Sequence, residues 1–198
     1  MTNSTLVAST RRGLRLEYLT IGWNIVEGIV AIGAGVAAGS IALVVFGLDS
    51  FIEVGAAGVV VWQLKGADEE RERRALRLIA LTFFALAVYV AASAGRELIL
   101  GERPRESILG IVVATSSLVV MPVLGMAKRR TAQQLGNSVL LADSAETLFC
   151  SYLSAIVLVG LGLNAVLGWW WADPVAACGI AVLAVREGSE AWRGDTCC

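Results

Sequence analysis

Residues 137–163 read NSVLLADSAETLFCSYLSAIVLVGLGL, a long and mostly apolar stretch. A helix rises about 1.5 Å per residue, so about 20 apolar residues cross the roughly 30 Å hydrocarbon core of a bilayer. The stretch is long enough to form such a helix, yet Asp143 and Glu146 lie among its apolar residues. It therefore predicts a membrane-spanning helix that carries acids where acids are rare.

The composition of the whole chain supports a membrane protein. Of its 198 residues, 57% are hydrophobic and 17% charged, and its mean hydropathy is +0.71. Soluble domains average roughly 45–50% apolar and about 25% charged residues, so a soluble all-α bundle is the weaker alternative. The net charge of −1 and three prolines exclude a basic nucleic-acid binder and a disordered chain. Histidine is absent, which removes the commonest general base and the usual zinc ligand.

Hydropathy predicts an all-α integral membrane protein, a single domain over 1–198. Six stretches meet the length test: about 16–37, 40–63, 75–95, 107–126, 137–163 and 167–187. The stretches are continuous, whereas strands of a membrane barrel would alternate over about 10 residues. Short connections between them predict an antiparallel six-helix bundle.

Positive charge is distributed unevenly between the predicted loops. Thirteen of the 16 lysines and arginines fall on one side: Arg11, Arg12, Arg15, Lys65, Arg71, Arg73, Arg74, Arg77, Lys128, Arg129, Arg130, Arg186 and Arg193. The other side has Arg96, Arg103 and Arg105. By the positive-inside rule we expect both termini to be cytoplasmic.

Six carboxylates fall inside the predicted spans, namely Glu27, Asp49, Glu53, Asp143, Glu146 and, near one end, Asp173. A charge at the bilayer centre costs about 2.5–3.5 kcal/mol, and such residues usually face a cavity or an ion. The nearest lysines and arginines lie at the cytoplasmic ends of the spans, so we expect no basic partner at comparable depth. The acids should then be protonated, hydrated or neutralised by a cation.

The spacing of these residues predicts a metal site. Asp49 and Glu53 are four residues apart, as are Glu146 and Cys150, so each pair lies on one helix face. Two facing helices that each supply two ligands can form a four-ligand site. Carboxylates and thiolates bind divalent transition metals. A faint internal repeat of 97 residues, which aligns Asp49 with Glu146, also groups the two pairs.

Two runs resemble the cation diffusion facilitator family. Gly39-Ser40-Ile41-Ala42-Leu43 with 48–53 (LDSFIE) resembles its second helix, and 137–146 (NSVLLADSAE) resembles its fifth. Asn24, Glu27 and 171–174 (WADP) also fit its pattern. The resemblance implies a six-helix exporter of divalent metals in exchange for protons, commonly a homodimer.

The chain departs from that pattern at several positions. Glu146 replaces the usual histidine and Cys150 the usual aspartate of the fifth helix, and Phe46 replaces an upstream acid. The metal set expected from the residues and the resemblance is therefore Asp49, Glu53, Glu146 and Cys150. Zinc, iron, manganese, cobalt and cadmium all remain open as substrates. The chain ends soon after the sixth stretch, so we expect the family's cytoplasmic C-terminal domain to be missing.

Other polar residues have two interpretations each. Cys150 is either a ligand or a packed small side chain. Asn24 and Glu27 either line the route or bond to neighbouring helices. Asp143 either relays ions or supports the ligands. Cys197 and Cys198 either capture a soft metal or belong to a tail with incidental thiols.

We therefore expect a divalent-cation efflux transporter in a lipid bilayer, with protons as counter-ion, and no enzyme, because no nucleophile–base pair is present. Fourteen arginines against two lysines are typical of GC-rich bacteria, which predicts a multi-pass plasma-membrane protein. The alternative is a non-transporting metal sensor or scaffold that retains the fold.

Overall fold

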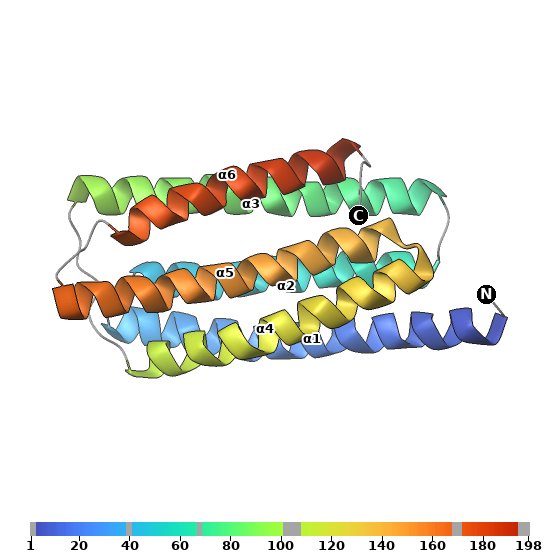
Figure 1. Ribbon diagram of the computed structural model, residues 1–198, viewed down its shortest axis with the longest axis horizontal. Helices are drawn as coiled ribbons and strands as arrows, with labels where there is room; N and C mark the ends of the chain where they lie inside the picture. The colour runs from blue at the N-terminus through green and yellow to red at the C-terminus, as the bar shows by residue number, and fades with distance from the viewer. Residues whose placement is uncertain (1–2, 39–40, 67–68, 101–107, 168–171, 194–198) are drawn as a thin grey trace.

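In the described part of the chain, six long helices run side by side in the computed structural model (Figure 1). The structure describes residues 3–38, 41–66, 69–100, 108–167 and 172–193. In chain order the helices are α1 (Asn3–Ala38), α2 (Ile41–Leu64), α3 (Glu69–Leu100), α4 (Ile108–Leu135), α5 (Ser138–Leu167) and α6 (Ala172–Arg193). No strand occurs among the described residues. The predicted all-α architecture is confirmed.

The described helices present apolar side chains outward, as a membrane protein does. Five of them, α1 to α5, contain segments long and apolar enough to cross a bilayer. Val88 of α3 and Val119 of α4 are 71% and 64% exposed, although both lie in mid-helix. The described part of α6 does not meet the same criterion, but its Val182 is 70% exposed. The predicted helical membrane bundle is confirmed, with six as an approximate count of spans.

Several helices extend beyond the predicted spans at their charged ends. The first begins at Asn3 rather than near 16, and the fourth continues to Leu135 rather than ending near 126. Arginine, lysine and glutamate are good helix formers, so the backbone hydrogen bonding continues after the apolar stretch has ended. Hydropathy locates the part of a helix that lies in lipid, and not the whole helix.

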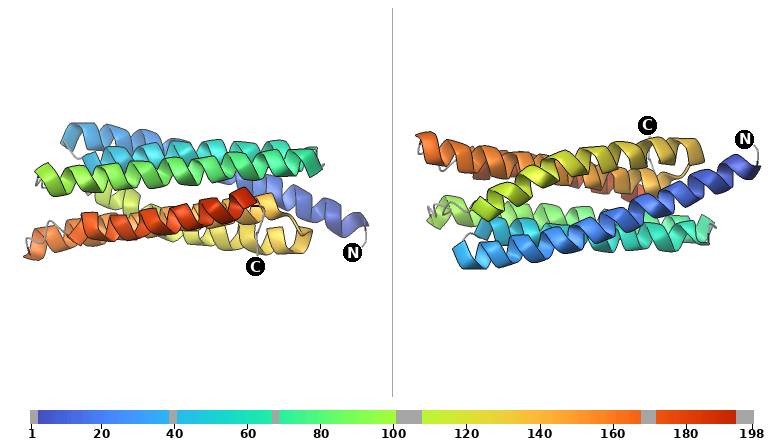
Figure 2. Two further views of the ribbon diagram at one scale, coloured as in Figure 1. Left: turned by 90° about the horizontal axis from the view of Figure 1, so that it is seen from above. Right: turned by 90° about the horizontal axis from the view of Figure 1, so that it is seen from below.

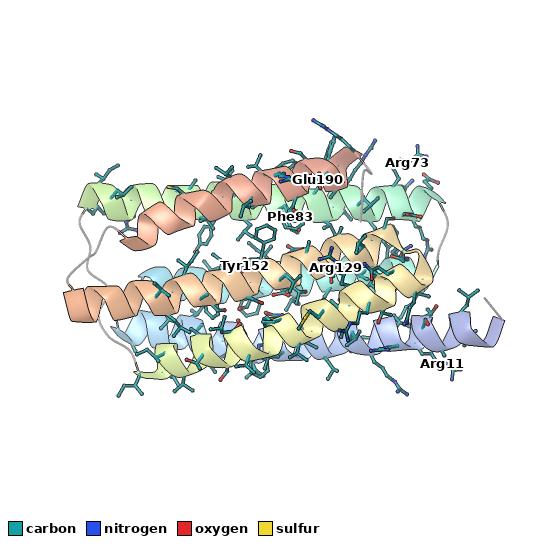
Figure 3. The ribbon with its side chains drawn as sticks, viewed as in Figure 1. Arg11, Arg73, Phe83, Arg129, Tyr152 and Glu190 are labelled. Atoms are coloured by element: carbon teal, nitrogen blue, oxygen red, sulfur yellow. The ribbon has the colours of Figure 1, made fainter. Side chains whose placement is uncertain are left out.

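Successive helices are antiparallel, so charged segments from different parts of the chain meet at one end of the bundle (Figure 1). We call this the basic end. Helices α1, α3 and α5 begin there, and helices α2, α4 and α6 end there. Arg11 and Arg73 mark it in Figure 3. Three cations lie over aromatic rings in this region, at 5.2–5.8 Å: Lys65 over Tyr18, Arg71 over Trp62 and Arg77 over Trp192. Tyrosine and tryptophan prefer the membrane–water interface.

The helices form two packing groups. Helices α3 and α6 pack mainly on each other, while α1, α2, α4 and α5 form a second group (Figure 1). Helix α1 crosses this second group obliquely, from α2 toward α4 at the basic end (Figure 2). A groove of about 450 Å³ between α5 and the α3–α6 pair is lined by Phe83, Tyr152 and Glu190, among others (Figure 3).

Candidate metal site

The four expected metal ligands lie in the interior of the second group. Asp49 and Glu53 are one turn apart on α2, and Glu146 and Cys150 are one turn apart on α5, against which α2 packs. Their side chains are 2–6% exposed. Helical periodicity thus places both pairs on inward faces, as the spacing predicts.

Glu53 and Glu146 differ from Glu27 and Asp143 in their hydrogen bonding. None of their four carboxylate oxygens accepts a hydrogen bond from any described residue. Thr147 lies beside Glu53, but its hydroxyl donates to the carbonyl of Asp143 at 3.2 Å. A buried carboxylate without a donor is costly, so these two side chains are suited to binding a cation.

The four side chains are near one another without forming a compact ligand set. Glu53 is close enough to Asp49, Glu146 and Cys150 for their charges to interact. However, no three Cys, Asp or Glu side chains in the described residues are arranged to hold a metal ion.

Cys150 has both an apolar and a polar environment. It belongs to a buried cluster with Leu43, Phe46 and Met121. Its Sγ also lies 3.9 Å from the Ser117 hydroxyl of α4. The thiol therefore packs as a small apolar side chain while remaining next to Asp49 and Glu53.

Glu27 and Asn24 lie on the buried face of α1. Among the described residues, three side chains donate hydrogen bonds to Glu27: the Trp23 indole, Ser50 at 3.1 Å and Ser117 at 3.2 Å. Asn24 donates to the carbonyl of Thr20 at 3.0 Å. Of the two interpretations, the structure favours bonding to neighbouring helices for Glu27, because its donors come from α1, α2 and α4.

The expectation that no basic residue pairs with the buried acids is wrong for Asp143. The Lys128 ammonium donates to Asp143 Oδ2 at 2.6 Å and to Thr147 Oγ1 at 3.1 Å. It also forms an ion pair with Glu17 Oε2 at 3.0 Å. The three charged side chains are 0% exposed. Lys128 was expected between the fourth and fifth spans at their cytoplasmic ends, but α4 continues past it for two turns.

Sequence reasoning missed Glu17 and Lys128, although periodicity could have found both. The buried positions of α4 recur at Ala114, Ser117, Met121 and Gly125, and the next step of this pattern is Lys128. On α1, Glu17 begins a buried polar stripe that continues through Thr20, Asn24 and Glu27. Recurrence every three or four residues marks one helix face, and that face contacts neighbouring helices here.

Some expectations lie outside the described residues. These concern Cys197, Cys198 and the side chain of Asp173. The orientation of the termini, the homodimer and the identity of the ligands also stay predictions.

Buried acids on packed membrane helices are typical of ion-transporting proteins. The chain belongs to the cation efflux family: it matches the cation efflux transmembrane domain over residues 18–193. This family consists of transporters rather than enzymes, and the resemblance noted from the second and fifth helices is confirmed.

Individual relatives are more distant. An "uncharacterized transporter" of Synechocystis sp. is 26% identical over 186 residues, which cover 88% of this chain and 60% of the relative. The magnetosome protein MamB of Magnetospira sp. is 23% identical over 87% of this chain and 61% of its own. The cation-efflux pump FieF of Shewanella oneidensis is 32% identical over half of this chain and 32% of its own. The chain thus spans at most about three fifths of these relatives.

Proposed function

We propose that this chain exports a divalent metal cation in exchange for protons, through a site formed by Asp49, Glu53, Glu146 and Cys150. The observation that carries the proposal is the state of Glu53 and Glu146. Both are buried on adjacent helices, and none of their four oxygens accepts a hydrogen bond from a described residue. A divalent cation would neutralise both groups and draw the two pairs together.

Exchange with protons follows from the chemistry of the ligands. Carboxylates and thiols bind metals in their deprotonated form, so metal binding releases protons and protons displace the metal. We propose that metal enters from the basic end, which the positive-inside rule places in the cytoplasm. Movement of the helices then exposes the site to the other side, where external protons release the metal.

The substrate is a transition metal of the class that three carboxylates and one thiol accept. Zinc, iron, manganese, cobalt and cadmium all meet this description, because the affinity of a site discriminates poorly among them. FieF, named a cation-efflux pump, supports export as the direction of transport. We further propose a bacterial plasma membrane as the location and a homodimer as the assembly, as in the family generally.

The test is metal flux into proteoliposomes that contain the purified protein, screened over the five metals at several pH values. The native protein should transport at least one of these metals in the direction opposite to the proton flow. Asp49→Ala and Glu146→Ala should abolish flux, because each removes an oxygen ligand. Glu70→Ala serves as the control, since Glu70 is exposed and forms an ion pair with the likewise exposed Arg74.

Two outcomes would contradict the proposal. Unchanged flux in both ligand variants would remove the site assignment. Metal binding without flux in the native protein would instead support the alternative of a membrane sensor or scaffold.

A further inference from the structure

The buried lysine of α4 is not used by the mechanism above. Among the described residues, Lys128 is the only lysine or arginine that is fully buried. Its ammonium has three partners, each within 3.1 Å: Asp143, Glu17 and Thr147. These partners come from α1 and α5, so one cation links three helices.

The three charged groups lie between the candidate metal site and the basic end. On α5, Asp143 precedes Glu146 and Cys150, which are about 5 and 10 Å further from the basic end along the helix. Lys128 lies two turns before α4 ends at the basic end. The group is also connected to the candidate metal site. Lys128 donates to Thr147, which follows Glu146 in the chain, and the charge of Lys128 interacts with that of Glu53.

Such a group hinders a cation in two ways. Its side chains are 0% exposed, so they fill the space between the three helices. The ammonium also occupies the carboxylates of Glu17 and Asp143, so neither carboxylate is available to attract a passing cation.

Holding the helices together does not by itself account for the ions. Apolar side chains of similar volume often stabilise a protein as well as a buried ion pair, or better. Ionic contacts, however, can break and re-form as discrete states when helices move, and interfaces that switch between two arrangements use them.

We propose that Lys128, Glu17 and Asp143 form the barrier between the metal site and the basic end, and that their separation admits the metal. Lys128 is then a positioning residue for transport rather than a metal ligand. The inference deepens the proposed function and rests on it, but its test needs no metal.

Cys150 provides the readout. In a Cys178→Ser, Cys197→Ser, Cys198→Ser background it is the remaining thiol, and it lies beyond the barrier as seen from the basic end. The measurement is its rate of modification by a positively charged, membrane-impermeant methanethiosulfonate. The reagent is applied from each side in turn, to right-side-out and inverted vesicles without metal, and modification is followed by mass spectrometry.

Lys128→Met should raise the rate of Cys150 modification from the basic-end side by about tenfold or more. A tenfold change corresponds to a shift of about 1.4 kcal/mol in the equilibrium between the closed and open barrier. The rate from the opposite side should not rise. Lys128→Arg keeps the charge and should stay within a few-fold of the native rate. Arg129→Met is the matched control: it also removes a cation from α4, but Arg129 is exposed.

Lys128→Met leaves two buried carboxylates without a counter-ion and can fail to fold. The triple variant Lys128→Met, Glu17→Gln, Asp143→Asn retains side-chain volume without charge, and should show the same one-sided increase. An unchanged rate in a helical, monodisperse triple variant would overturn the proposal. So would an equal increase from both sides, which signals general loosening. Absence of metal flux in the native protein would leave this result standing and overturn only the proposed function.

Discussion

At the scale of single residues, hydrogen bonding divides the buried acids into three kinds. Glu27 accepts three hydrogen bonds, Asp143 is paired with Lys128, and Glu53 accepts none from the described residues. Only the last kind gains a partner by binding a cation. An intramembrane acid is therefore better judged by what donates to it than by its depth.

The role of Cys150 can be tested by changing the ligand from sulfur to oxygen. In Cys150→Asp we expect the affinity for Cd²⁺ to fall relative to that for Mn²⁺ by about tenfold or more, because thiolates favour soft metals and carboxylates hard ones. Competition titrations of the purified protein with both metals measure the ratio. Cys178→Asp is the control, since Cys178 is exposed on α6. A constant ratio in Cys150→Asp would assign this thiol to apolar packing.

At the scale of helices, α1 and α2 approach each other through two glycines. A Cβ atom added to Gly47 would lie 2.9 Å from both the Gly28 carbonyl oxygen and the Ile32 backbone nitrogen. A Cβ atom on Gly28 would lie 3.0 Å from the Gly47 carbonyl oxygen. Small residues allow membrane helices to approach closely, and this contact positions Glu27 to accept from Ser50.

Gly47→Ala should therefore lower the free energy of unfolding by about 1–3 kcal/mol, as overpacking does. The thermal transition in detergent, followed by circular dichroism, measures the effect. Gly55→Ala on the same helix is the matched control: a Cβ atom there meets nothing within 4 Å, and alanine favours a helix over glycine by about 1 kcal/mol. Equal transitions for the two variants would show that the close approach is not essential.

At the scale of the whole molecule, the distribution of basic residues predicts which end faces the cytoplasm. Arg73 lies near the start of α3 at the basic end, and Ile99 lies near the other end of the same helix and is 84% exposed. In a background with all four cysteines replaced by serine, we expect an impermeant maleimide to label Ile99→Cys in intact cells. Arg73→Cys should be labelled only after permeabilisation. The reverse pattern would invert the topology and the proposed direction of export.

Much of this architecture was predictable because it depends on local sequence. Long apolar stretches must form helices in lipid, where backbone groups have no water to bond with. The i, i+4 spacing then places Asp49 with Glu53 and Glu146 with Cys150 on shared faces. The helix ends were less accurate, since hydropathy changes at Lys128 while the α4 backbone continues to Leu135.

Local sequence is enough to define the membrane environment, the helices and the acids that a transporter of cations needs, because hydropathy and helical periodicity act over a few turns. Which of these acids are paired depends on how the helices pack against one another. Glu17 and Lys128 are far apart in the chain. Helix α1 crosses its group obliquely (Figure 2), and the Glu17 carboxylate lies 3.0 Å from the Lys128 ammonium. Electrostatic energy depends on distance in space and on burial. For this reason Lys128, which the sequence places next to a loop, is the buried partner of two carboxylates in the folded protein.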